Sequence, residues 1–344
     1  TVLAAHPPVW LVGACLAGGH FAIGRPSTER ARRKGTEGQT VNELILKGID
    51  GANPLGFLAA VGTVVLYTKC DPAASLRWSK DQGSWRPIVR VSDCDEDGFV
   101  ERLSSALFNS SSAPFDHQAK LPFLATQFAE IVKKSAEGAT REDRRTADLI
   151  AAFGNEVCVD KEVFKDTLLR MVRSGDAAGQ GLPYYASSIR KQTGAESIRR
   201  TLFDFWDYMD HGFSLRWDPM EDQRYALRWH DPSKNKDTYA PGVMNGANAL
   251  ALEALSLFPT APVGYDLATT GFFEDRTNRI FFTWPIWDAP VSLGTIRSLV
   301  SLRSLHVEKP PRDTLLAMGI AEIYRCERIA PNQWYKNFSI SFPA

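Results

Sequence analysis

The chain has 344 residues, of which 44% are hydrophobic and 23% charged, so its composition predicts a globular fold and excludes wholesale disorder. Forty basic residues balance forty acidic ones, which argues against a protein that coats nucleic acid unaided, because such proteins carry a basic excess. The neutral composition still allows a local basic groove, or a role as one subunit of a larger assembly. The cysteines have no C-x-x-C spacing and are odd in number, so we expect no zinc ribbon, no disulfide framework and a reducing, cytoplasmic setting.

The first forty residues differ from the rest. Residues 9–24 form an apolar run that is shorter than the roughly 20 residues needed to cross a bilayer. No basic segment precedes this run, so a secretory signal is poorly supported, and residues 25–40 are charged like a linker. We expect residues 1–40 to be a loose or artefactual extension, with a membrane anchor as the alternative, and the folded part to begin near Val41.

A strand over residues 43–51 is expected to lead into a helix that is capped by Asn53 and has Pro54 at its first position. This helix is apolar nearly all round, which predicts a buried central element. Its small residues leave room for a second backbone to approach closely: Gly56, Ala59, Ala60 and Gly62.

Short strands are expected around residues 75–79 and 84–91, joined by a turn at 80–83. Thr140 with Asp143 resembles a capping box that opens a helix toward Phe153. Asp160 is a suitable cap for a helix whose apolar residues recur on one face until Gly175 ends it.

The Gly-rich residues 174–188 are the expected internal boundary, dividing the folded part into residues 41–180 and 181–344. Helices are then expected at 195–210, 246–257 and 292–303, followed by a helix and a strand within 313–329. Helices and short antiparallel strands or hairpins are mixed without regular βαβ alternation, which predicts an α+β fold.

Several motifs could carry chemistry, and we assign none of them a catalytic role, a metal or a cofactor. Residues 93–98 copy the start of a calcium-binding loop, but Ser104 stands where the closing Glu belongs, so an acidic surface turn is expected. The Gly179–Gly181 run lacks the Lys-Ser/Thr of a phosphate-binding loop. An acidic and histidine-containing cluster offers the alternative of a metal-dependent nuclease or other hydrolase, although solvated polar residues explain it equally well: Asp204, Asp207, Asp210, His211, His230 and Asp231.

The tripeptide Leu-Arg-Trp occurs at residues 215–217 and 227–229, with a third copy at 76–78. Because side chains alternate along a strand, the first two copies predict an antiparallel hairpin with Leu and Trp on one face and Arg216 and Arg228 on the other. The indoles then either pack in the core beside solvated arginines, or the hairpin is a basic ribbon that contacts phosphates. The second interpretation gives these candidate nucleic-acid-binding residues: Arg190, Lys191, Arg199, Arg200, Arg216, Trp217, Arg228, Trp229, Lys234 and Lys236.

Segments across residues 43–338 carry a family resemblance: GIDGANPLGFLAAVGTVVLY, SLRWDP with YALRWHDPS, GANALALEALSLFPTAPVGYDLATTGF, and WPIWDAPVSLGTIRSLVSL. In this order they resemble the large-subunit-like CRISPR-associated proteins of the type I-U (I-G) interference systems. The resemblance implies an antiviral role as a non-catalytic subunit of an RNA-guided complex. Such a subunit binds crRNA or target DNA beside other interference subunits, without a membrane, and leaves cleavage to a separate helicase–nuclease. A purely structural adaptor is the further alternative.

Overall fold

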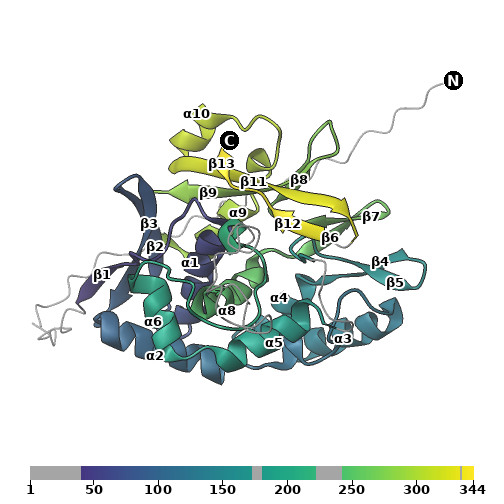
Figure 1. Ribbon diagram of the computed structural model, residues 1–344, viewed down its shortest axis with the longest axis horizontal. Coiled ribbons are helices and arrows are strands. Elements are labelled where there is room, and N and C mark those ends of the chain that lie inside the picture. Colours follow the sequence, from purple (N-terminus) through teal and green to yellow (C-terminus); the bar gives the residue numbers. More distant parts are fainter. Residues whose placement is uncertain (1–39, 173–179, 222–241, 334) are drawn as a thin grey trace, which may run out of the picture. The chain divides into compact units, whose positions relative to one another are not determined.

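The chain divides into two units, Thr1–Gly38 and Gln39–Ala344, and only the second is described below. The computed structural model describes residues 40–172, 180–221, 242–333 and 335–344. The expected extension, residues 1–40, therefore lies outside the described residues apart from Thr40. The described part is a mixed α+β fold, which confirms the predicted fold class (Figure 1).

The strand pairs in the described ranges are all antiparallel. The first sheet has the order β1 (Val41–Ile45), β3 (Ser84–Ser92), β2 (Ser75–Asp81) and β10 (Val291–Ser292). The second has the order β12 (Tyr335–Phe338), β11 (Ile320–Asn332), β9 (Ile280–Trp287) and β8 (Phe272–Glu274), and β13 (Phe342–Pro343) also pairs with β11. Two further pairs are β4 (Gly154–Asp160) with β5 (Val163–Asp166), and β6 (Thr260–Val263) with β7 (Asp266–Thr269).

Two buried helices, α1 (Pro54–Tyr67) and α8 (Asn245–Ala254), lie between the sheets and an outer group of helices (Figure 1). The outer group consists of α2 (Glu96–Asn109), α3 (Ala125–Glu137), α4 (Arg145–Ala151), α5 (Leu182–Gln192) and α6 (Ala195–Phe203). Two short helices, α9 (Leu293–Val300) and α10 (Arg312–Ala317), belong to the C-terminal part. None of the helices in the described ranges has both the length and the apolar character that crossing a bilayer requires.

The predicted start and burial of α1 are confirmed. The Asn53 side chain accepts hydrogen bonds from the backbone N–H groups of Leu55 and Gly56, at 2.8 and 3.3 Å. Every residue of α1 is buried except Val65. A Cβ atom on Gly62 would lie 1.8 Å from the carbonyl oxygen of Leu250, so α8 crosses α1 where only glycine leaves space.

The predicted pair of strands around residues 75–91 is also confirmed. Strands β2 and β3 are joined at Gln82 and Gly83, whose φ angles of 47° and 89° are typical of the two-residue turns that suit a twisted hairpin. Leu76 and Trp78 of β2 are buried, and Arg77 lies on the opposite side of the strand.

The helix expected after Asp160 is wrong, because the chain forms strand β5 there. Lys161 has a φ angle of 58° and turns the chain, so that β5 pairs with β4. Phe164 then stacks on Phe128 with ring centroids 3.9 Å apart. A short apolar run fits either a strand or a helix, and the tertiary packing of Phe164 decides between them.

The Gly-rich segment is shorter than expected, since α5 begins at Leu182 with Pro183 in its first turn. The main hydrophobic core contains residues from both sides of position 180, such as Phe57 and Trp217, so the two expected parts share a core. Helix α6 ends at Phe203 and does not continue to residue 210, whereas the helices expected at 246–257 and 292–303 are present as α8 and α9.

Candidate nucleic-acid interface

The structure contradicts the first arm of the expected Leu-Arg-Trp hairpin. Residues 215–217 are not part of a strand, and residues 219–221 are helical. Trp217 is fully buried, and its indole N–H donates a hydrogen bond of 2.8 Å to the carbonyl oxygen of Leu169. Trp217 is therefore a core residue, as in the packing interpretation. The second arm, with Arg228, Trp229, Lys234 and Lys236, lies outside the described residues.

Arg216 does not lie on a solvent-facing ribbon. Its φ angle of 60° interrupts the alternation of side chains that an extended strand would have. The residue is 8% exposed, and its guanidinium carbon lies 5.8 Å from the centre of the Tyr185 ring. A buried guanidinium against an aromatic ring stabilises the fold and offers little surface to a phosphate.

Arg190 forms part of a buried ionic cluster that holds four helices together. Glu253 of α8 is fully buried and contacts Arg145 of α4 through two 2.6 Å hydrogen bonds and Arg190 of α5 through one of 2.7 Å. Arg190 also donates to the carbonyl oxygens of Leu107 and Ser110 at the end of α2. These contacts satisfy helix-terminal carbonyl groups, so the role of Arg190 is structural.

Arg199 and Arg200 of α6 are both engaged by carboxylates. Arg199 pairs with Asp97 of α2. Arg200 contacts Asp207 at 2.5 Å and Asp210 at 2.8 Å, and the hydrogen bond to Asp207 raises the pKa of the Arg200 guanidinium. Of the candidate residues that the structure describes, Lys191 alone is exposed without an ion pair to another described residue.

The same contacts occupy two residues of the acidic and histidine cluster, Asp207 and Asp210, while Asp204 is exposed. Asp210 accepts the backbone N–H of Asn245 at 2.9 Å, so Arg200 and Asp210 tie α6 to the start of α8. His211 is exposed, and no group of three metal-ligating side chains occurs within the described ranges. His230 and Asp231 lie outside them. In residues 93–98, Asp95 caps α2 by accepting the N–H of Gly98 at 2.9 Å, so this run begins a helix rather than forming a surface turn.

A different basic surface, which the sequence did not single out, lies on the outer side of the first sheet. Arg77 of β2 and Arg86 and Arg90 of β3 share this side, because Arg77 faces Ile88, midway between the two arginines of β3. Leu76, Trp78 and Val89 point to the core from the other side of the same strands: all are at most 1% exposed. We call the set Arg77, Arg86 and Arg90, with Glu43 of β1, the arginine face.

Two of the three guanidinium groups on the arginine face share one carboxylate. Arg77 contacts Glu43 at 2.8 Å and Arg90 contacts it at 3.5 Å, while Arg86 donates to the carbonyl oxygen of Ile49 at 2.9 Å. The hydrogen bond from Arg77 lowers the pKa of Glu43, so this carboxylate is ionised near neutral pH. The face therefore has a local surplus of positive charge on a chain whose formal net charge is zero.

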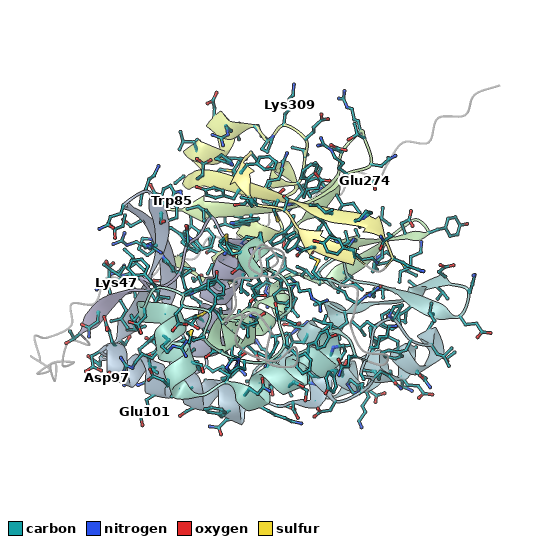
Figure 2. All side chains as sticks on the ribbon, in the orientation of Figure 1. Lys47, Trp85, Asp97, Glu101, Glu274 and Lys309 are labelled. Carbon is teal, nitrogen blue, oxygen red and sulfur yellow. The ribbon has the colours of Figure 1, made fainter. Side chains whose placement is uncertain are left out.

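One aromatic group lies at the end of the same hairpin, on the side opposite to the arginine face, because it comes directly before Arg86 in β3. Trp85 is partly exposed, and the ammonium group of Lys80 lies 6.0 Å from the centre of its ring (Figure 2). Trp85 packs against the hydrophobic core, so it does not extend the arginine face.

No protein-family model and no curated protein matches this sequence.

The sequence signal that could have identified the arginine face is the upstream copy of the tripeptide, Leu76-Arg77-Trp78. Side chains alternate along a strand, so this copy places Arg77 on the side opposite to Leu76 and Trp78. The contributions of Arg86 and Arg90 depend on the register of β3 against β2, which the turn at residues 82–83 sets.

Proposed function

We propose that this chain is a non-catalytic, nucleic-acid-binding subunit of an RNA-guided CRISPR type I interference complex, acting in the cytoplasm and contacting phosphates through the arginine face. The observation that supports the proposal is the array of Arg77, Arg86 and Arg90 on one side of a sheet whose other side is packed in the core. The family resemblance supplies crRNA or target DNA as the nucleic acid and other interference subunits as partners.

The dimensions of the arginine face suit a contact with more than one phosphate. Residues on one side of a strand recur about every 6.8 Å, so Arg86 and Arg90 are separated by about 14 Å along β3. Arg77 lies on the neighbouring strand between them, opposite Ile88. A rigid sheet holds these side chains at fixed spacing, which lowers the entropy lost when they bind a flexible strand.

Glu43 is the internal competitor of a bound phosphate. Its carboxylate is 40% exposed, and Arg77 and Arg90 are 26% and 43% exposed. Ion pairs between exposed groups contribute about 0–1 kcal/mol, so a phosphate can replace Glu43 at small cost. Binding by a few arginines at one surface is also compatible with the neutral composition, which excluded only a uniformly basic surface.

The test replaces Arg77 and Arg90 together by Gln and follows the binding of labelled single-stranded RNA and DNA across a salt series, with and without partner subunits. Loss of two phosphate contacts is expected to reduce the slope of log K against log salt by about 1.4 for single strands. The control replaces Arg279 and Arg312, which are 55% and 54% exposed and also form ion pairs, with Asp275 and Glu322. An unchanged affinity and slope in the Arg77→Gln/Arg90→Gln protein would refute the proposal.

A further inference from the structure

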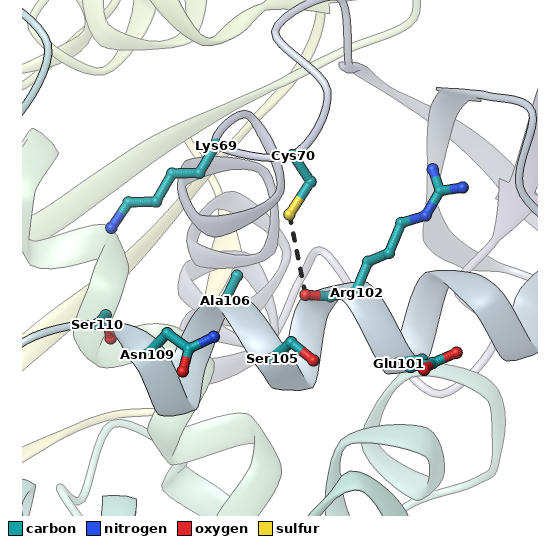
Figure 3. Close-up of a pocket in the computed structure, with 8 residues that line it drawn as sticks. All are labelled: Lys69, Cys70, Glu101, Arg102, Ser105, Ala106, Asn109 and Ser110. Carbon is teal, nitrogen blue, oxygen red and sulfur yellow. Dashed lines mark hydrogen bonds between the residues drawn. The ribbon is translucent and has the colours of Figure 1, made fainter.

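An open pocket with a volume of about 520 Å³ lies between the turn that follows α1 and the side of α2 (Figure 3). Lys69 and Cys70 line it from the turn, and Ser105 and Asn109 line it from α2. Pockets of roughly 300–1,000 Å³ are the size that holds small ligands. None of the residues of the arginine face lines this pocket.

Three polar side chains of the pocket have no partner in the described part of the chain. The side chains of Lys69, Ser105 and Asn109 form no hydrogen bond or ion pair with any residue in the described ranges. Lys69 extends toward the end of the pocket where Asn109 and Ser110 lie (Figure 3). An ammonium, a hydroxyl and an amide together offer several hydrogen-bond donors to one ligand.

Two arginines lie behind this end of the pocket. Ser110 lines the pocket and accepts a hydrogen bond of 2.8 Å from Arg190, which shares Glu253 with Arg145. Two arginines therefore face one carboxylate, and both oxygens of that carboxylate are occupied by them. Burial, and next the nearby Arg145, lower the pKa of Lys69.

Acidic groups also lie near the pocket. Glu101 also lines it, but at the end away from Lys69 (Figure 3). Asp143 lies near Lys69 and Asp116 near Arg190. The carbonyl groups of residues 107, 110 and 111, at the C-terminal end of α2, would otherwise repel an anion, but they accept hydrogen bonds from Arg190 and Arg145.

From this arrangement we infer that the pocket binds a phosphate group, with Lys69 as its cationic ligand and Ser105 and Asn109 as hydrogen-bond donors. Phosphate presents the three or more acceptor oxygens that this donor set can satisfy. The phosphate belongs either to a small molecule or to a nucleic-acid chain, and the pocket is open enough for both. This site is separate from the arginine face and does not rest on the proposed function.

Cys70 provides a direct reporter, because its thiol is exposed and lines the pocket, whereas Cys94, Cys158 and Cys326 are buried. The experiment measures alkylation of Cys70 by N-ethylmaleimide, followed by peptide mass spectrometry, in the full chain with increasing inorganic phosphate. Sodium chloride keeps the ionic strength constant, so that screening does not change. Increasing phosphate is expected to lower the rate of Cys70 alkylation until the rate reaches a plateau.

The variant Lys69→Gln removes the charge and keeps a polar side chain that is one atom shorter. It is expected to raise the phosphate concentration for half-protection about tenfold or more, the effect of losing one charge-assisted hydrogen bond. The control variant Lys309→Gln changes an exposed lysine that lies on the far side of the unit from α2 (Figure 2), and should leave protection unchanged. Absence of saturable protection in the wild type, or equal protection in Lys69→Gln, would overturn the inference.

A second arm identifies the source of the phosphate. A short single-stranded RNA is added in place of phosphate, either with a 5′-phosphate or with a 5′-hydroxyl. If both RNAs slow the alkylation of Cys70, the pocket binds internal backbone phosphates. If only the 5′-phosphorylated RNA slows it, the pocket binds a terminal or free phosphate. The Arg77→Gln/Arg90→Gln protein should retain protection by inorganic phosphate, so failure of the proposed function and failure of this site give different results.

Discussion

Removing the carboxylate of the buried cluster should be among the most destabilising single changes in the described part of the chain. In Glu253→Ala, Arg145 and Arg190 lose a common partner while their side chains stay only 7% and 10% exposed. Breaking a buried ion pair by removing one partner costs about 3–5 kcal/mol, because the remaining charge is left without compensation. Here two guanidinium groups are left, so we expect the upper end of that range.

Such a loss is a large share of the roughly 5–15 kcal/mol that separates folded from unfolded domains. At about 2 °C per kcal/mol for a domain of this size, the melting temperature should fall by about 10 °C. The assay is urea and thermal unfolding followed by circular dichroism. Asp266→Ala is the matched control, since it removes the partner of Lys165 from an ion pair whose carboxylate is 86% exposed, and it should cost less than about 1 kcal/mol.

A rescue variant separates lost charge compensation from lost packing. Replacing all three members together, as Arg145→Met, Arg190→Met and Glu253→Leu, removes every buried charge and keeps similar volume, so it should recover most of the stability lost in Glu253→Ala. The hydrogen bonds to carbonyl groups at the end of α2 are not restored, and a residual loss of about 1 kcal/mol per unsatisfied group is expected. A cost below about 1 kcal/mol for Glu253→Ala itself would refute the reasoning.

Three further changes test other parts of the fold. Gly62→Ala should lower the free energy of unfolding in urea by more than about 3 kcal/mol, since its Cβ would meet the backbone of Leu250 at 1.8 Å. The control Gly294→Ala, whose Cβ would have its nearest atom at 3.9 Å, should be neutral or stabilising. Similar values for the two variants would contradict the close crossing of α1 and α8. Trp217→Ala should lower the free energy of unfolding by about 3–5 kcal/mol in the same assay and leave the RNA affinity of the folded fraction unchanged. A loss of affinity at constant stability would show that the indole stacks on bases instead. Burial lowers the pKa of His306 in the folded protein, so the unfolded chain binds the proton more readily and stability should fall as the pH drops through the ordinary histidine pKa of about 6.5. Melting temperatures at pH 7.5 and 5.5 should therefore differ more in the wild type than in His306→Gln, and equal differences would contradict this.

The parts of the fold that could be predicted are those that local sequence decides. Asn53 and Pro54 fix the start of α1, and Gln82 with Gly83 fixes the turn between β2 and β3. Each acts through backbone preferences within a few residues. The stretch after Asp160 could not be assigned in this way, because its apolar residues fit a helix or a strand, and Phe128, from α3, decides the outcome.

The repeated tripeptide shows the limit of pattern alone. Leu76-Arg77-Trp78 lies in a strand, where alternation places the arginine outside and the other two residues in the core. Leu215-Arg216-Trp217 has the same letters, but the left-handed backbone at Arg216 places all three residues in the interior. The difference comes from the neighbours, since β3 and β10 flank β2 on both sides, whereas residues 215–217 are not part of a strand.

The charge composition of the sequence also could not show where a binding surface lies, because it does not separate buried arginines from exposed ones. Several arginines of this chain serve the interior, where their guanidinium groups satisfy backbone carbonyl groups. Arg325 donates to the carbonyl oxygens of Val307 and Glu308, and Arg328 donates to that of Leu168, although both arginines are at most 7% exposed. Burial lowers the pKa of Arg328 to about 10, which still leaves it charged at neutral pH. Such arginines add to the net charge of the chain but not to the charge of its outer surface. A formal net charge of zero therefore neither supports nor excludes nucleic-acid binding. Only the position of each guanidinium group can decide the question.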